Sequence, residues 1–520
     1  MQQPDVLIVG GGLNGLACAL FLCRSGLTVQ VLDDKQIVGG IHRTEFPFAK
    51  APRLPTFTGA HRVGFVPGAL AAQLGVTLPL APRDPALFVP TTTPGRYLLA
   101  GPGAAGLRAA DPSDADALDA MHAELDALVS DLATAWIAAP VSIEEIRERW
   151  IRPELRDAFT GLVRGTFAEY VARFNVQSGL VKAALAADSL GGSFASWDTP
   201  GSGASLLVRH AAASPAGGGD AIPLGGMAAV ARALGDAGKA AGVRFATGTA
   251  VTQILVEGNA ATGVVLEDGR ILRANAVVTS ADPWRLRALV GPSHLSAEYT
   301  RRIDAWVRPG GIAKLLVAFA ELPRFACLPE ENGQHRATTL LLPGGEDDAV
   351  RALGRAFADA NAGRIPIETP IELVFPNAAD PSIRDPDGRE SASLLVPWVP
   401  YDVAGSTWTS EEERFTSALL DTLESFAPGA RASVVDTVLL HPKKLETHFG
   451  VTRGHLHHVD DTALFGDRLP PTTPLSGLYT CGRGCGPAAG VVGVAGLNAA
   501  RRVIADLELA LERTEVGIHE

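Results

Sequence analysis

The sequence predicts an α/β protein in which a Rossmann-type nucleotide-binding domain is interleaved with a second, α+β domain. Three features predict this class. The first forty residues read as a strand, a glycine-rich turn, a helix and a second strand. Residues 250–279 read as a meander of short strands, and residues 477–511 read as a strand followed by a long helix. Because two long stretches without a nucleotide motif separate these segments, one domain is expected to be assembled from distant parts of the chain.

The N-terminal unit begins with a buried strand and a glycine-rich turn. Residues 5–9 are apolar and mostly β-branched after the first position, which is typical of a strand buried on both faces. Gly10, Gly12 and Gly15 follow at once in the spacing G-x-G-x-x-G and lead into an apolar helix, whose N-terminus offers free N–H groups to a pyrophosphate. Asp33 ends the next strand, 18 residues after Gly15, where a carboxylate accepts hydrogen bonds from an adenosine ribose.

A second copy of the same glycine spacing starts at Gly101. Gly101, Gly103 and Gly106 match the string, but no helix of useful length fits before Pro112, and no strand ending in an acid follows at the right distance. We therefore expect this stretch to be a loop. The N-terminal copy alone has the sequence context of a nucleotide site.

Gly39, Gly40 and Arg43 lie just beyond the second strand, and this glycine doublet is where the chain resembles a known family. The sequence is similar to the phytoene desaturase and amine oxidase superfamily, and within it most similar to the group called pyridine nucleotide-disulphide oxidoreductase domain-containing protein 2. The resemblance implies a glutathione reductase-like FAD-binding domain that holds FAD non-covalently. Four stretches carry the resemblance, in the family's order: residues 10–40, 223–283, 311–323 and 477–500.

The resemblance also assigns parts of the FAD molecule to positions in this sequence. It implies that the glycine doublet packs on the pyrophosphate, that Val251 touches the adenine through backbone atoms, and that the last long helix points its N-terminus at the pyrimidine end of the flavin. A helix N-terminus carries roughly half a positive charge and would stabilise the negative charge of a reduced flavin. The predicted FAD-binding residues are Gly10, Gly12, Leu13, Asn14, Gly15, Asp33, Asp34, Gly39, Gly40, Arg43, Val251, Gly482, Arg483, Gly490, Val491 and Val492.

The last glycine-rich stretch departs from the family. Where relatives have Thr-His-Pro-Gly-Gly-Gly, this sequence has the residues from Cys485 to Gly490, in which the histidine is absent and two glycines are alanines. Arg483, which follows Gly482, stands where many flavin oxidases have a carboxylate. FAD is still expected to bind, but the chemistry of the relatives does not transfer directly.

Three residues are candidates for catalysis: Lys314, His458 and Cys485. The resemblance places a lysine at Lys314, close to the flavin N5 through a water, and an apolar strand lowers a lysine pKa; the alternative is a solvent-facing lysine on an edge strand. His458 matches a family histidine that lines the substrate cavity, and the alternative is a surface side chain. Cys485 precedes the flavin-facing helix, whose dipole lowers a thiol pKa, and the alternative is a small buried residue.

The segment that contains His458 also suggests a metal site. His455, His457 and His458 are followed by Asp460 and Asp461, and three histidines with nearby carboxylates can bind zinc. However, no cysteine or second ligand pair accompanies them, and the resemblance implies no metal. We therefore expect no metal ion here.

The stretches without a nucleotide motif are expected to form the substrate-binding part. The FAD domain is predicted to comprise residues 1–79, 219–295 and 465–520, and the substrate domain residues 80–218 and 296–464. Apolar residues recur at helical spacing in the first part of the substrate domain, with acidic residues on the other face. A helical lid or a homodimer face is expected there.

The composition limits the partners and the location. The formal net charge is −12, from 45 basic and 57 acidic residues, which argues against nucleic acid or an anionic membrane surface as a partner. Residues 6–23 are mostly apolar, but glycines and Asn14 interrupt them and they are shorter than the ~20 residues of a membrane span. No integral membrane segment is expected. Five scattered cysteines form no disulfide pattern, so the cytoplasm is the simplest location.

Together these features predict a FAD-dependent oxidoreductase of the desaturase or oxidase type. The expected reaction takes a hydride from a small, mostly apolar organic substrate and forms a C=C or C=N bond, and dioxygen or a quinone then reoxidises the flavin. Two alternatives stay open. One is a flavin-dependent double-bond isomerase without net redox, and the other is a flavin-binding assembly or regulatory protein without turnover.

Overall fold

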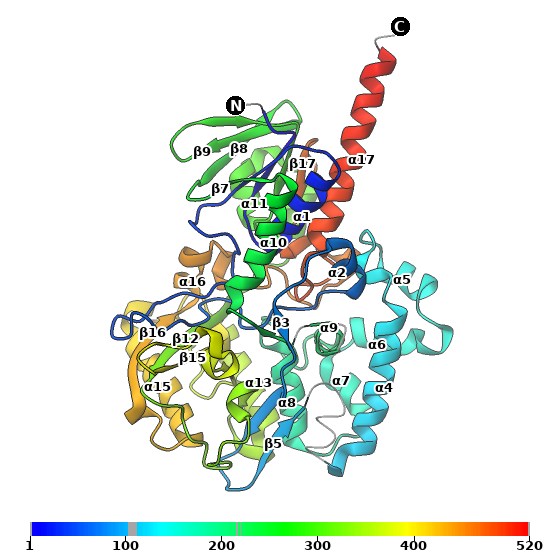
Figure 1. Ribbon diagram of the computed structural model, residues 1–520. Coiled ribbons are helices and arrows are strands. Elements are labelled where there is room, and N and C mark those ends of the chain that lie inside the picture. The colour runs from blue at the N-terminus through cyan, green and yellow to red at the C-terminus, as the bar shows by residue number, and fades with distance from the viewer. Residues whose placement is uncertain (1–2, 102–111, 215–216, 219, 518–520) are drawn as a thin grey trace.

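The computed structural model describes residues 3–101, 112–214, 217–218 and 220–517. In Figure 1, two small sheets and the C-terminal helix α17 (Val494–Gly517) occupy the upper part of the molecule, a large sheet lies at the lower left, and a group of helices lies at the lower right. Gly103 and Gly106 of the second glycine motif lie outside the described residues, so the loop expected there stays a prediction.

A five-stranded parallel sheet forms the centre of the upper part. Its strand order is β17-β11-β1-β2-β7, so strands from both ends of the chain lie beside strands from its middle. Four of the five strands are almost entirely buried, because helices cover a parallel sheet on both faces. The strands are β1 (Val6–Val9), β2 (Val29–Leu32), β7 (Arg244–Ala246), β11 (Ala276–Thr279) and β17 (Leu478–Thr480), and the helices beside them include α1 (Leu13–Arg24), α10 (Met227–Ala241), α11 (Pro283–Val290) and α17. The predicted α/β class with a Rossmann-type domain is confirmed.

The strands expected between residues 250 and 279 are present, but they do not form one meander. Three of them make a small antiparallel sheet of order β10-β9-β8. The fourth, β11, pairs in parallel with β1 instead, because all four of its side chains are buried and need cover on both faces. The strands of the small sheet are β8 (Val251–Glu257), β9 (Ala260–Leu266) and β10 (Ile271–Arg273).

A seven-stranded mixed sheet forms the lower left of the molecule (Figure 1). Its order is β16-β12-β15-β14-β13-β4-β5, and all ten residues of β12 are buried between β15 and β16. Lys314 therefore lies on an interior strand, and the alternative of a solvent-facing lysine on an edge strand is wrong. The strands are β4 (Leu87–Pro90), β5 (Tyr97–Ala100), β12 (Gly310–Phe319), β13 (Thr338–Leu341), β14 (Ile371–Val374), β15 (Glu390–Pro400) and β16 (Val434–Leu440). A separate two-stranded ribbon joins β3 (Leu80–Ala81) to β6 (Ile222–Pro223).

Helices complete the lower right and the flanks of the large sheet. The apolar periodicity of the first long helix, α4, is borne out, because Leu118, Met121, Leu125 and Leu128 are all buried. The helices at the lower right are α4 (Ala115–Asp131), α5 (Ile143–Arg149), α6 (Arg156–Arg164), α7 (Phe167–Ala172), α8 (Gly179–Leu190) and α9 (Gly203–Ala213). The other helices are α2 (Gly68–Leu74), α12 (Ala297–Asp304), α13 (Gly345–Asn361), α14 (Pro376–Ala379), α15 (Trp408–Phe426) and α16 (Pro442–Phe449). Among the described residues, no helix combines the length and the apolar character needed to cross a bilayer.

Candidate functional site

A cleft opens at the carboxyl ends of β1 and β2, where the N-terminal glycine motif lies. Ligands of open α/β sheets bind at this edge. Twelve of the sixteen residues predicted to bind FAD line the cleft: Gly10, Gly12, Leu13, Asn14, Asp33, Asp34, Gly39, Gly40, Arg43, Val251, Arg483 and Val492. The cleft wall also contains residues that were not predicted to bind FAD, among them His42, Ser280, Asp282 and Arg285.

The glycines of the first turn serve two different purposes. A Cβ at Gly12 would meet no atom within 4 Å, so Gly12 borders open space in the cleft. A Cβ at Gly15 would lie 2.2 Å from the carbonyl oxygen of Gly10, so Gly15 lets α1 pack closely on the turn. Gly10 itself has a φ of +98°, a conformation that favours glycine.

Two helix N-termini meet at this cleft. The backbone N–H of Gly493, just before α17, donates a hydrogen bond of 2.6 Å to Oδ1 of Asn14 in the first turn of α1. The glycine doublet lies against them, since Gly39 N donates to Gly11 O at 2.8 Å. Helix N-termini offer unpaired N–H groups and a positive dipole end to a phosphate. This arrangement fits the pyrophosphate of a dinucleotide.

The other four predicted residues do not line the cleft. Gly15 packs inside, as described, and a Cβ at Gly482 would lie 2.5 Å from the carbonyl oxygen of Ala281. Gly490 lines a neighbouring cavity, and Val491 is buried beside Phe65. These residues shape the backbone around the cleft instead of forming its wall.

A smaller inner cavity of about 140 Å³ adjoins the cleft, and Ile41 and Arg483 line both. The Arg483 guanidinium makes no hydrogen bond or ion pair with any residue that the structure describes. Burial lowers the pKa of Arg483 to about 10, so it is still charged at neutral pH. The wall of the inner cavity is rich in ionisable side chains: His61, Arg62, Asp188, Arg209, Glu372, His457, Asp461 and Arg483.

Lys314 lies behind the wall of the inner cavity. Its side chain is completely buried, and its Nζ lies 3.1 Å from Nδ1 of His61. Burial lowers the pKa of Lys314 to about 7, although the nearby Glu372 carboxylate acts in the opposite direction. The lowered pKa expected from the sequence is confirmed, while His61 and Glu372 had no recognisable sequence motif.

A larger cavity of about 690 Å³ adjoins the inner cavity, and we call it the vestibule. Asp188, Ser189 and Arg209 line both cavities. Most of the vestibule wall is apolar, and this part consists of Leu80, Ala81, Pro82, Ala86, Leu87, Ala100, Ala184, Leu185, Leu206, Ala213 and Ala221.

A ring of two arginines and two aspartates separates the vestibule from the inner cavity. Asp188 accepts hydrogen bonds from Arg62 Nη2 at 2.6 Å and contacts Arg209 Nε at 2.8 Å. Asp220 closes the ring, with its Oδ1 2.7 Å from Arg209 Nη2 and 3.9 Å from Arg62 Nη1. The ring therefore lies where the two cavities meet.

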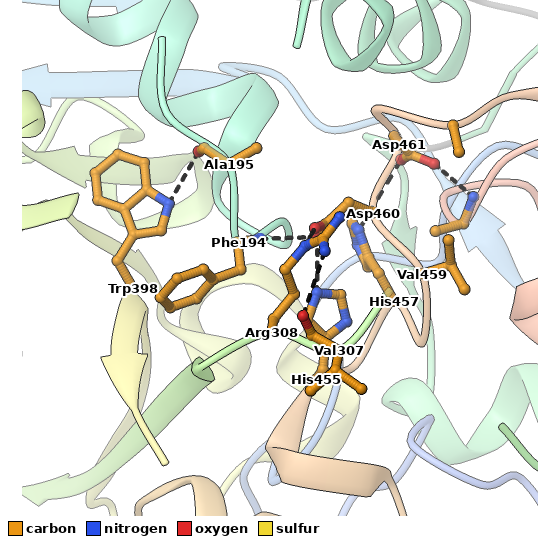
Figure 2. A network of polar contacts seen from close by, with 12 residues as sticks. Phe194, Ala195, Val307, Arg308, Trp398, His455, His457, Val459, Asp460 and Asp461 are labelled. Atoms are coloured by element: carbon orange, nitrogen blue, oxygen red, sulfur yellow. Dashed lines mark hydrogen bonds and ion pairs between the residues drawn. The ribbon is translucent and has the colours of Figure 1, made fainter. Parts of the chain in front are cut away.

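Residues 449–461 form a segment that touches both sites, and Figure 2 shows the polar network that holds it. Asp460 is the centre of this network: its carboxylate accepts hydrogen bonds from His455 Nε2 and Arg308 Nε, both at 2.7 Å. The fully buried Arg468 lies 3.8 Å from Asp461 and donates to the carbonyl oxygens of Val459, Asp460, Ala463 and Arg483. Within the described part of the chain, no three His, Cys, Asp or Glu side chains are grouped to hold a metal ion.

The structure separates the neighbouring histidines of this segment. His458, with a φ of +60°, lines the cleft at the carboxyl ends of β1 and β2, whereas His457 lines the inner cavity. Burial lowers the pKa of both imidazoles well below the usual value, and Arg483 adds to this effect. Both rings are therefore neutral at physiological pH.

Cys485 lies in a fully enclosed position. Its Sγ donates weak hydrogen bonds to the carbonyl oxygens of Thr480 and Gly482, both at 3.1 Å. Burial raises the pKa of the thiol, which is opposite to the lowering expected from a helix dipole. Burial of the sulfur disfavours the charged thiolate, so the structure supports the alternative of a small buried residue.

Comparison with known proteins identifies the family. Residues 13–504 match the family described as flavin-containing amine oxidoreductase. The chain belongs to this family. The protein is therefore an oxidoreductase that uses FAD, and the expected resemblance to amine oxidases and phytoene desaturases is confirmed.

Individual relatives cover nearly the whole chain. The chain is 30% identical to pyridine nucleotide-disulfide oxidoreductase domain-containing protein 2 of Rattus norvegicus, over 97% of this chain and 94% of the relative. It is 26% identical to hydroxyneurosporene desaturase of Cereibacter sphaeroides, over 97% of this chain and 98% of the relative. The crystal structure of an oxidoreductase from Methanosarcina mazei shares the fold, with a TM-score of 0.58, 18% identity, and coverage of 97% and 99% of the two chains.

Proposed function

We propose that the protein takes a hydride from a C–H bond of an organic substrate and passes it to FAD, which leaves a C=C or C=N bond in the product. The observation that carries this proposal is the inner cavity, which adjoins the FAD cleft and has the buried Lys314–His61 pair behind its wall. Bound FAD supplies the hydride acceptor. The chain's own residues bind and orient the substrate, exclude water and take up the proton that leaves with the hydride.

The twelve predicted residues that line the cleft are the proposed FAD contacts. The N-termini of α1 and α17 would hold the pyrophosphate, and Asp33, at the end of β2, would accept hydrogen bonds from the adenosine ribose. Arg483, a charged group without an ion-pair partner among the described residues, is proposed to face an anionic part of FAD. We further propose that residues 1–79, 219–295 and 465–520 form the FAD domain and that residues 80–218 and 296–464 form the substrate domain.

The sizes of the two cavities limit the substrate. A cavity of about 150 Å³ holds one benzene ring, so the inner cavity of about 140 Å³ accepts only the reacting part of the molecule. The apolar walls of the vestibule suit the remaining, mostly apolar part. The charged wall of the inner cavity favours a polar group close to the reacting carbon.

The proton balance gives Lys314 its proposed role. When a CH–CH or CH–NH unit becomes C=C or C=N, it loses a hydride and a proton. An amine with a pKa of about 7 is partly neutral at physiological pH and can accept that proton. Dioxygen or a quinone is the proposed acceptor that reoxidises the flavin.

The proposal can be tested with compounds that leave the purified protein when it is denatured. Each compound would be mixed with the FAD-bound protein without oxygen, while flavin absorbance and product mass are recorded. The expected result is loss of the flavin absorbance and a product that is lighter by two hydrogen atoms. A product of unchanged mass, formed without any electron acceptor, would overturn the proposal in favour of an isomerase.

A further inference from the structure

The large sheet places a lysine and a glutamate on the same face. Lys314 of β12 lies opposite Leu395 of β15, and Glu372 of β14 lies opposite the same leucine. Residues that lie directly opposite each other on adjacent strands point to the same side of a sheet. The side chains of Lys314 and Glu372 therefore reach the side on which Leu395 lines the inner cavity.

One imidazole connects these two side chains. His61 Nδ1 lies 3.1 Å from Lys314 Nζ, and His61 Nε2 lies 2.5 Å from Glu372 Oε1. The three residues are 0%, 2% and 8% exposed for Lys314, His61 and Glu372, so water screens their interactions very little. They form a buried chain of hydrogen bonds from the lysine through the histidine to the glutamate.

The donors and acceptors of this chain follow from its geometry. A protonated Lys314 can only donate, so His61 Nδ1 accepts, and the remaining ring proton on Nε2 is donated to Glu372. This arrangement requires a neutral imidazole. Burial, assisted by the charge of Lys314, lowers the pKa of His61 to about 4, which keeps the ring neutral at physiological pH.

The groups around Glu372 keep it ionised. Burial alone raises its pKa, but Arg62, whose Nε lies 2.9 Å from Glu372 Oε1, and His61 outweigh burial and hold the pKa well below the usual range. Arg209 acts in the same direction, and Asp188 binds both arginines. Within this cluster, Lys314 is the group whose proton is exchanged near neutral pH.

This chain of hydrogen bonds also lies between Lys314 and the inner cavity. His61 and Glu372 line the inner cavity, whereas Lys314 lies behind them. His61 is held next to the FAD cleft, because Ala60 N donates a 2.9 Å hydrogen bond to the carbonyl oxygen of Ile41, a residue that lines both sites. The backbone next to His61 is therefore joined to a residue that lines both sites.

From this geometry we infer that His61 and Glu372 are positioning residues that hold the Lys314 amine and set the charge state in which it accepts a proton from the substrate. This inference rests on the proposed function. It assigns roles to two residues that lie between Lys314 and the inner cavity. Removing the charge of Glu372 removes the group that favours protonated Lys314, so the lysine must lose its proton at a lower pH.

The experiment follows the protonation of Lys314 by NMR, so it requires no substrate. The sequence contains only seven lysines, which makes selective 13C labelling of the lysine Cε atoms practical. In the FAD-bound protein, one signal should titrate near pH 7, well below the usual lysine range, and Lys314→Met should remove that signal. In Glu372→Gln its midpoint should fall by about one pH unit or more, the size of shift that a neighbouring opposite charge produces.

A surface cluster of the same residue types provides the control. Glu412 contacts His441 Nε2 at 3.0 Å and Lys444 Nζ at 2.7 Å and is 33% exposed, so Glu412→Gln should leave the Lys314 midpoint unchanged. If Glu372→Gln does not fold, His61→Leu retains the Glu372–Arg62 pair and removes the acceptor of the lysine proton, which should also lower the midpoint. An unchanged midpoint in a folded variant overturns the inference. Because no substrate is used, that result is distinct from a failure of the proposed hydride transfer.

Discussion

Replacing Asp460 with asparagine tests whether the network in Figure 2 anchors the segment between the FAD cleft and the inner cavity. Oδ1 of Asp460 accepts hydrogen bonds from Phe194 N at 2.8 Å and His455 Nε2 at 2.7 Å. Oδ2 accepts from Arg308 Nε at 2.7 Å. Asparagine keeps the shape of the side chain, but it removes the charge and presents a donor where an acceptor is needed.

The size of the effect follows from burial. Removing one partner of a buried ion pair costs about 3–5 kcal/mol, and we expect about 3 kcal/mol because Arg308 is 27% exposed. The entropy of unfolding is about 2.1 cal/mol/K per residue. If half of this 520-residue chain unfolds as one cooperative unit, the entropy of unfolding is about 0.55 kcal/mol/K. The melting temperature should therefore fall by about 5 °C.

The melting temperature and the flavin content of the purified protein measure this effect. Asp236→Asn is the control, because the pair of Asp236 with Lys239 is 60% and 66% exposed and should change the melting temperature by less than about 1 °C. If Asp460→Asn keeps both the melting temperature and the FAD content of the wild type, the anchoring argument is refuted.

The stability that Asp460→Asn loses relative to the wild type should depend on pH. Burial raises the pKa of Asp460, but His455 and Arg308 outweigh it and hold the pKa well below the usual range. A carboxyl group whose pKa is depressed by folding contributes stability above its unfolded pKa of about 3.9 and loses that contribution as pH falls. The stability difference between wild type and variant should therefore be complete at pH 6 and shrink below about pH 4.

Three further predictions concern the cleft, the lysine and the thiol. Gly12→Ala should leave the stability of the FAD-free protein unchanged but weaken FAD binding in a flavin-fluorescence titration. Gly15→Ala should destabilise even the FAD-free protein by roughly 2 kcal/mol, because its Cβ would lie 2.2 Å from the Gly10 carbonyl oxygen. Lys314→Met should slow anaerobic flavin reduction by roughly 100-fold, the usual contribution of a general base; an unchanged stopped-flow rate would remove Lys314 from the mechanism. Cys485 should stay unmodified by iodoacetamide at pH 8 in the folded protein, since burial raises its pKa, and labelling found there by mass spectrometry would contradict this.

The N-terminal nucleotide unit was predictable because its rules are local. A β-branched strand, a turn that needs glycine at Gly10 and Gly15, and a helix follow one another within twenty residues, so backbone sterics alone indicate the structure. Most of the predicted residues at the glycine motif and the doublet line the cleft for the same reason. For Lys314 the sequence indicated an apolar strand that would lower its pKa but left a solvent-facing position on an edge strand open, and the buried interior strand decides for the first.

Placement across the molecule was not predictable from spacing. Ala276–Thr279 was expected in a meander with its sequence neighbours, but it joins β1, which lies about 270 residues earlier. For Cys485 the sequence left open a thiol activated by a helix dipole and a small buried residue, and enclosure of the sulfur decides for the second. The pairing partner of the strand and the burial of the sulfur both depend on which distant segments pack against them. A short sequence pattern carries no information about those segments.

The sequence by itself determined a dinucleotide-binding α/β protein, because the turn, strand and helix that cradle a dinucleotide are specified by neighbouring residues and their backbone conformations. The resemblance to a flavoprotein family then implied that the dinucleotide is FAD. Only the tertiary structure decided which ionisable groups surround Lys314. Lys314, His61 and Glu372 come from three segments separated by up to 311 positions, and no periodicity connects them. Their protonation states depend on burial and on one another's charges, and both exist only after the sheet and the FAD-cleft loop have come together.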